Sequence, residues 1–156
     1  MAAWIILYGI IQAYSPKLFL KEDNKKINLV DISKNWVLYL LINLILLTCL
    51  LFFFSEIFLT TIFLFSGLFI FCGIFAVNSS IHSYLILHFS KMNRVSLDVG
   101  FYYMANATGR FFGTLLSGLS YQFGGLTLSL ALSTIMIAFC LYLTSFLQES
   151  YNEQKI

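Results

Sequence analysis

The chain has 156 residues, of which 60% are hydrophobic and only 10% are charged, and its formal net charge is +2. A typical soluble domain has about 45–50% apolar and about 25% charged residues, so this composition excludes an ordinary soluble domain and indicates an integral membrane protein. The sequence contains no glycine-rich phosphate loop, no nucleophile motif and no basic stretch with interleaved aromatic residues. We therefore expect neither an enzyme nor a protein that binds nucleic acid.

The cysteine and histidine residues give no sign of a metal or cofactor site. The three cysteines are far apart, each within an apolar run, which is typical of small packing residues. His82 and His88 are six residues apart and share no helical face, so they do not form a ligand pair. We expect no metal and no cofactor.

Residues 1–16 form the first apolar run, which ends at Pro16. A helix of this length reaches only about 22 Å, short of the roughly 30 Å of a bilayer core. The first basic residue, Lys17, follows the apolar run instead of preceding it, and no small-residue cleavage site is present, so the pattern is not that of a signal peptide. We expect the second half of a membrane span whose beginning is missing, or a truncated span.

Residues 17–35 are polar and contain five lysines, which predicts a solvated cytoplasmic loop. The loop has room for a short interfacial helix, whose apolar face would be Ile27, Leu29, Val30 and Ile32. A lipid-binding polybasic site is the alternative interpretation, although three acidic residues dilute the charge.

Two uncharged apolar runs follow at residues 36–54 and 57–89, separated by a short turn, and each predicts a membrane span. The second run is longer than one crossing needs and becomes polar in its second half. Asn78 and His82 share a helical face there at i, i+4 spacing. These two side chains either form hydrogen bonds between helices or line a transport pathway.

Residues 99–123 form the next span, with Arg110 near its middle. A charge at the bilayer midplane costs about 2.5–3.5 kcal/mol on insertion scales, and such residues usually face a bundle interior or a watery cavity. Tyr103 and Asn106 belong to the same polar face at helical spacing, together with Thr114 and Ser117. This pattern is typical of a helix that lines a transport pathway.

A stripe of small residues runs beside that polar face at i, i+4 spacing: Ala105, Gly109, Gly113 and Ser117. Small residues let another membrane helix approach closely. We therefore interpret the stripe as a helix-packing surface.

Gly124 and Gly125 predict a break before the last span, residues 126–147. With residues 17–35 placed in the cytoplasm, eight of the nine basic residues fall on the cytoplasmic side, and the ninth is Arg110. This topology places Met1 on the outer side, which is a second indication that the beginning of the protein is missing.

Arg110 and Asn78 lie at similar depths, about 16 Å and about 15 Å from the inner ends of their spans. No acidic residue occurs at this depth. The counter-charge of Arg110 is therefore a substrate anion, an acid on a missing part of the protein, or nothing stronger than Asn, Tyr and Ser. An arginine suits an anion, because its planar fork binds two oxygens and it stays charged.

Two stretches carry a family resemblance: AVNSSIHSYLIL at 76–87 and VGFYYMANATGRFFGTLLSGLSYQFGG at 99–125. They resemble the C-terminal half of the major facilitator superfamily transporters, and within that superfamily they are most similar to the organoarsenical efflux permeases. YGIIQAYSP at 8–16 is similar to the end of the eighth helix of these transporters. The resemblance covers nearly the whole chain.

The resemblance implies a twelve-helix fold in two halves around a central site. This chain would supply the end of helix eight and helices nine to twelve, an all-α membrane domain of about 4.5 spans over residues 1–156. The first seven helices are absent, and residues 17–35 lack the Gly-Asp-Arg-rich motif that many facilitators have there. The resemblance also implies export of an arsenylated three-carbon phosphate ester, with Arg110 binding this anion and Asn78 and His82 assisting.

The leading hypothesis is therefore a C-terminal fragment of a secondary transporter that exports a small anionic metabolite by alternating access in the bacterial inner membrane. Its partners would be the anionic substrate, the lipid bilayer, and the missing N-terminal half or a second copy. The coupling ion would most simply be the proton. The alternative is a small oligomeric or accessory membrane protein that uses the Gly109–Gly113 stripe as its interface.

Overall fold

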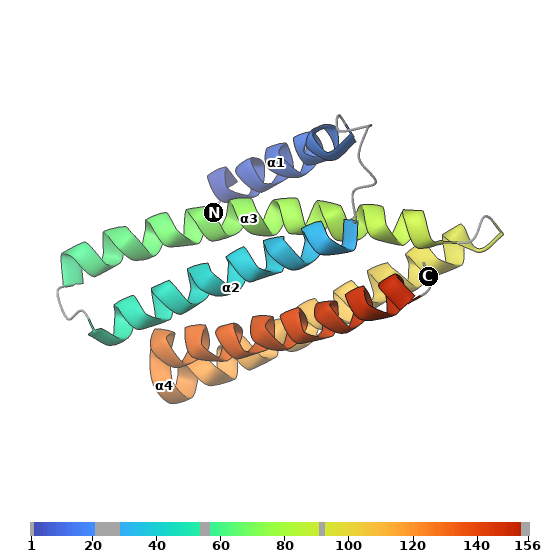
Figure 1. Ribbon diagram of the computed structural model, residues 1–156. Coiled ribbons are helices and arrows are strands. Elements are labelled where there is room, and N and C mark those ends of the chain that lie inside the picture. The colour runs from blue at the N-terminus through green and yellow to red at the C-terminus, as the bar shows by residue number, and fades with distance from the viewer. Residues whose placement is uncertain (1, 21–28, 54–56, 91–92, 154–156) are drawn as a thin grey trace.

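The chain is helical almost everywhere that the structure describes it. The computed structural model describes residues 2–20, 29–53, 57–90 and 93–153. The four helices are α1 (Ala2–Leu20), α2 (Leu29–Phe53), α3 (Ile57–Phe89) and α4 (Val95–Glu153) (Figure 1). The predicted all-α class is confirmed, and in a helix every interior backbone N–H and C=O is paired within the segment, as lipid requires.

α4 is a helical hairpin with a first arm, residues 95–123, and a second arm, residues 126–153. Its backbone leaves helical geometry at Gly124 (φ −146°, ψ 19°) and Gly125 (φ 64°, ψ −156°). The conformation of Gly125 belongs to a region that essentially only glycine adopts, which explains why the chain reverses here. The predicted break is confirmed, and the second arm turns back beside the first (Figure 1).

Within the described residues, three helices are long and apolar enough to cross a bilayer. The apolar segments are Val30–Phe53, Phe58–Leu87 and, over both arms of α4, Val95–Phe146. A shorter apolar segment, Trp4–Ser15, lies in α1. Apolar helices of this length with few charged residues indicate membrane crossing, so the chain is a multi-pass membrane protein.

α1 does not end at Pro16 but continues to Leu20. Proline has no backbone N–H, so Pro16 leaves the carbonyl of Gln12 without its helical donor. The Ser15 hydroxyl donates to this carbonyl at 3.1 Å, and such serine bonds let membrane helices tolerate proline. The predicted loop over residues 17–35 is therefore corrected at its start.

The predicted loop is also corrected at its end, because α2 begins at Leu29. Leu29, Val30 and Ile32, which were expected in a separate interfacial helix, belong to α2 instead. Asp31 lies in the first turn of α2, where a negative charge is favoured by the helix dipole. Ile27 lies outside the described residues.

One face of α2 forms the centre of the bundle. Its most buried side chains alternate at spacings of four and three residues, which is the seam pattern of packed helices: Ser33, Val37, Leu40, Leu44 and Leu47. Leu44 and Leu47 pack with Leu130 of the second arm of α4. α2 therefore has a side that holds α4 as well as a side that contacts α3.

The contact between α3 and α2 depends on Gly67, which is buried. A Cβ atom at this position would lie 2.5 Å from Cδ2 of Leu47, whereas nonbonded carbons prefer about 3.5–4.0 Å. A larger residue at this position would therefore force the buried side chain of Leu47 to shift, and small residues are common at such close contacts between membrane helices.

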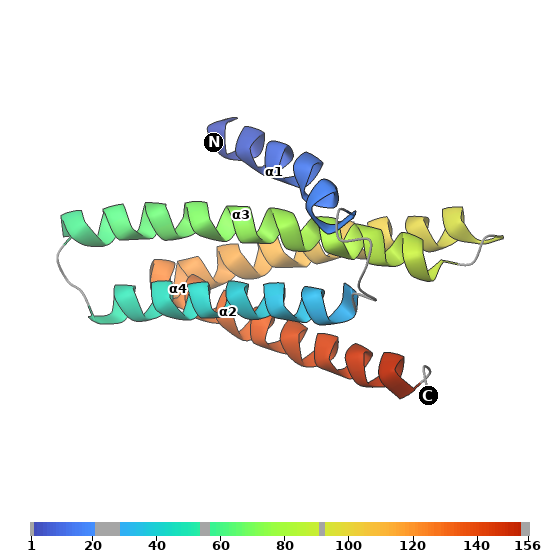
Figure 2. The same ribbon diagram turned by 45° about the horizontal axis from the view of Figure 1, so that its top comes forward.

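α1 packs along α3 (Figures 1 and 2), and α2 contacts both α3 and α4. The end of α2, the start of α3 and the turn within α4 lie at one end of the bundle. The start of α2, the end of α3, the start of α4 and the C-terminus lie at the other end. This alternation follows the order of ends that the predicted topology requires, and it places Lys34 and Arg94 at one end.

Candidate functional site

Arg110 lies about midway along the first arm of α4, with its side chain exposed. Among the described residues the guanidinium makes no ion pair. The carboxylate of the same arm, Asp98, is about 18 Å away along the helix axis. The structure therefore leaves this charge uncovered by protein, on an arm whose other side chains are mostly apolar.

The other polar groups on this arm differ in whether they are free to bind a ligand. The Thr108 and Thr114 hydroxyls donate to the carbonyls of Met104 and Phe111, each inside the helix. Tyr103 is 62% exposed, and its hydroxyl has no hydrogen-bond partner among the described residues. Asn106, between Tyr103 and Arg110, is half-buried. Arg110, Asn106 and Tyr103 therefore form one polar surface, which we call the first-arm face.

Asn78 and His82 lie elsewhere, in the interface between α3 and α2. Nε2 of His82 is 3.2 Å from Oγ of Ser33 on α2. Asn78 is 7% exposed, and its Oδ1 has no hydrogen-bond partner among the described residues. We call these three side chains, Ser33, Asn78 and His82, the interface cluster.

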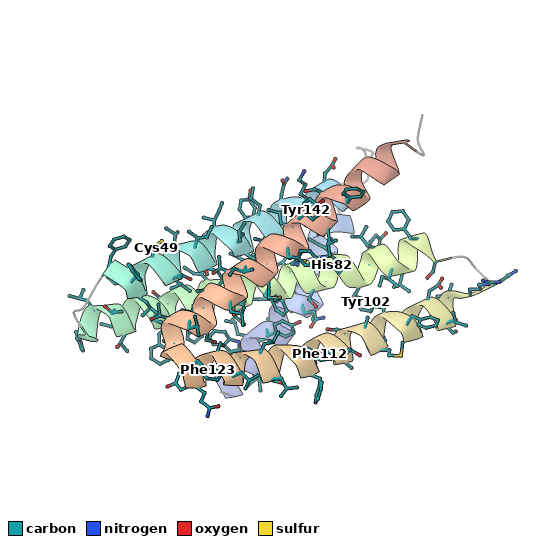
Figure 3. The ribbon with its side chains drawn as sticks, turned by 90° about the horizontal axis from the view of Figure 1, so that it is seen from below. Cys49, His82, Tyr102, Phe112, Phe123 and Tyr142 are labelled. Carbon is teal, nitrogen blue, oxygen red and sulfur yellow. The ribbon has the colours of Figure 1, made fainter. Side chains whose placement is uncertain are left out.

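The predicted substrate-binding residues thus divide between two places. No hydrogen bond joins Arg110 to Asn78, because the Asn78 oxygen has no described partner. α3 and the first arm meet where Oγ of Ser83 lies 3.5 Å from the hydroxyl of Tyr102. From this end the two helices diverge (Figures 1 and 3, with His82 and Tyr102 marked in Figure 3). Equal depth along two neighbouring spans does not bring these side chains into contact here.

The small-residue stripe faces open space. A Cβ atom at Gly109 or Gly113 would meet no atom within 4 Å. Both glycines and Ser117 line a partly open cavity of about 580 Å³ between α2, α3 and the two arms of α4. Ser117 Oγ lies 3.3 Å from Ser129 Oγ across it, and Ala105 is exposed. No helix of the described chain occupies the stripe, so a packing role remains a prediction.

Sequence reasoning missed Ser33 and Gly67. Ser33 fell within the expected loop, although its spacing from Val37 and Leu40 continues the buried seam of α2 and could have revealed it. Gly67 stood in an apolar run without a second small residue at i+4, because Phe71 occupies that position. Its role depends on the partner residue Leu47, which no local pattern identifies.

The described residues contain no group of three His, Cys, Asp or Glu side chains that could hold a metal ion. The three cysteines are free thiols: Cys72 is buried, whereas Cys49 and Cys140 are exposed. The geometry therefore offers helix surfaces and a cavity as candidate sites, and no described metal centre.

No protein-family model, curated protein or solved structure matches this chain. The functional argument therefore depends on the fold and on the geometry of the first-arm face and the interface cluster.

Proposed function

We propose that this chain is the C-terminal part of a secondary active transporter that moves a small anion across a membrane by alternating access. The observation that carries the proposal is Arg110. It is a permanent positive charge in the middle of an apolar helix, on a surface that the described residues leave uncovered and without a carboxylate partner.

The energetics of the bilayer require something to face this charge. Arg110 lies about 22 Å from the start of its arm and about 20 Å from the turn, too far to reach either interface without strain in the surrounding lipid. A central arginine costs about 2.5–3.5 kcal/mol on insertion scales, and more in calculations on an isolated helix. Such a charge is retained where it lines a pathway or meets an anion.

The chemistry of the first-arm face favours an anion with several oxygens. The guanidinium presents paired N–H donors that fit phosphate and carboxylate oxygens. The Tyr103 hydroxyl, free of described partners, adds a neutral donor two turns away, and Asn106 adds an amide between them. Asn78 and His82 do not belong to this group, because His82 bonds to Ser33 on α2.

The narrower identity rests on the resemblance of residues 76–87 and 99–125 to the major facilitator superfamily and its organoarsenical permeases. On this basis the cargo is an arsenylated three-carbon phosphate ester, exported across a bacterial inner membrane. The remaining helices of the transporter, or a second copy of the chain, would cover the first-arm face in the working protein.

The second candidate is an oligomeric or accessory membrane protein without transport of its own. The observation that favours it is the partly open cavity beside Gly109 and Gly113, which no helix of the described chain fills. An oligomer interface there predicts that Gly113→Leu disrupts the assembly, which native mass spectrometry in detergent would report as a change to monomers.

Arsenic efflux tests the transport proposal. Cells that express this chain, or a full-length relative with the equivalent arginine, are loaded with arsenate and the release of arsenic is measured. We expect Arg110→Ala to abolish release and Arg110→Lys to reduce it at least tenfold, because a point charge does not replace a two-pronged contact.

The matched control is Gln122→Ala, an exposed polar residue of the same arm, which should release arsenic at the wild-type rate. Membrane insertion of every variant is checked by the amount of chain in the membrane fraction. Release that persists in Arg110→Ala would show that Arg110 is structural and would contradict the proposal.

A further inference from the structure

We infer that His82 is the residue that takes up and releases the proton driving this transport. The inference rests on the proposed function and adds to it the residue that carries the coupling proton. It is carried by the interface cluster, Ser33, Asn78 and His82, which is separate from the first-arm face.

His82 is held between helices by a specific contact. Its Nε2 lies 3.2 Å from Oγ of Ser33, and Ser33 is only 1% exposed. The hydrophobic neighbours Val37, next in the seam of α2, and Ile81 on α3 are each 1% exposed. The half-buried imidazole is therefore held at one nitrogen by a contact between α3 and α2.

Asn78 supplies an acceptor that nothing described uses. It precedes His82 by one helical turn, so the two side chains are neighbours on the same face. Its Oδ1 is buried without a partner, and such orphaned atoms are rare enough in native structures to require an explanation.

A protonated imidazole could use both groups. Neutral histidine has one N–H donor, whereas the imidazolium has two and no acceptor. Ser33 Oγ can accept from Nε2, and Asn78 Oδ1 is then available for Nδ1–H after a side-chain rotation. The interface cluster therefore offers two hydrogen-bond acceptors, which the two N–H donors of charged His82 need. Neutral His82 has one N–H donor and uses only one of them.

The helices around the interface cluster also carry other charged or titratable groups. They are Asp31 and Lys34 on α2, Tyr84 on α3, Asp98 and Tyr102 on α4, and Tyr14 on α1. Asp31 and Lys34, which have opposite charges, lie on either side of Ser33 in the sequence of α2. His82 is the member of this group whose side chain ordinarily titrates near neutral pH.

The position of His82 suits transfer from one side of the membrane. It lies about 8 Å along the helix from Leu87, the last residue of the apolar segment of α3. One proton would bind the neutral imidazole while the cluster is open to one side, and the same proton would leave after the protein opens to the other. No other bond is made or broken.

The test uses the full chain in lipid nanodiscs with isotope-labelled histidine. The sequence has two histidines, so His88→Gln leaves His82 as the single reporter for nitrogen NMR. We expect His82 to change protonation between pH 5 and pH 8. Asn78→Leu should lower its proton affinity about tenfold, Asn78→Asp should raise it by at least as much, and Ser80→Ala, a buried control on α3, should leave it unchanged.

The same variants in proteoliposomes separate coupling from transport, with labelled 3-phosphoglycerate as the anion probe. We expect a pH gradient to drive accumulation of the anion by the wild-type chain. His82→Gln should keep anion exchange, but its pH-driven accumulation should fall at least tenfold. Two results would overturn the role of His82 and leave the proposed function standing. One is a pH-driven rate that is retained in His82→Gln, and the other is a proton affinity of His82 that does not change when Asn78 is replaced. Absence of anion movement both by this chain and by a full-length relative with the equivalent residues would overturn the proposed function and the coupling with it.

Discussion

The α2–α3 interface and the first arm of α4 both place polar side chains within apolar helices, but they cover them differently. Ser33 and Asn78 are at least nine-tenths buried between two helices of the chain, whereas Arg110 and Tyr103 are exposed. In water an exposed arginine would need no explanation; in a membrane it does. In the first region the polar side chains are covered by other helices of the chain, whereas the second region requires a ligand or another protein surface to cover it.

The largest expected difference in stability comes from substituting one glycine in each of the two regions. Gly67→Val should destabilise the bundle by about 3 kcal/mol, because the new side chain overlaps Leu47 and overpacking forces helices apart. Gly113→Val should change stability by less than about 0.5 kcal/mol, because its site is open. Thermal unfolding of both variants in the same detergent measures the difference.

Equal destabilisation by Gly67→Val and Gly113→Val would contradict this comparison. It would mean that the first arm is packed as tightly as α3, and that the open stripe does not exist in the membrane.

A smaller loss of stability is expected from a substitution in the turn between the two arms of α4. Gly125→Ala should cost about 1–3 kcal/mol, because its backbone conformation is one that residues with a Cβ avoid. Gly118→Ala, at an open site with helical backbone, should be neutral or slightly stabilising because alanine favours helices. Unfolding by a denaturing detergent, followed by circular dichroism, distinguishes the two variants. A neutral Gly125→Ala would show that the chain reverses elsewhere.

The smallest effect concerns hydrogen bonds. Ser33→Ala should destabilise the α2–α3 interface by about 0.6–1 kcal/mol, the usual range for a bond between membrane helices. Thr114→Ala removes a hydroxyl that bonds only within its own helix and should have a smaller effect. Hydrogen exchange of the α2 backbone provides the measurement, and faster exchange in Thr114→Ala than in Ser33→Ala would refute the assignment.

Composition and glycine placement predicted much of the fold. The uncharged runs predicted long apolar helices, and Gly124 and Gly125 predicted the reversal within α4. Both signals are local, since a bilayer demands continuous helices and a glycine pair interrupts them. The extension of α1 past Pro16 was not predicted, because it depends on a hydroxyl bond from Ser15 to Gln12.

The candidate site was less predictable, since it depends on how helices diverge. Counting residues placed Arg110 and Asn78 at similar depths, but depth says nothing about rotation about the helix axis or distance between axes. The partner of His82 is 49 residues away in the sequence, so its identity is a tertiary fact. By contrast, the sequence alone gives the charge of Arg110, and the helical spacing of its polar neighbours predicts that they share its face.

The most direct test of the central claim is calorimetric titration of the nanodisc-embedded chain with 3-phosphoglycerate, comparing wild type with Arg110→Ala and Gln122→Ala. If the first-arm face binds an oxyanion, Arg110→Ala should weaken binding at least tenfold, since a charged hydrogen bond contributes about 1.5–3 kcal/mol. Gln122→Ala should bind as the wild type does, and added salt should weaken binding to both. Equal affinities of wild type and Arg110→Ala, or no binding by a folded wild-type chain, would contradict the account.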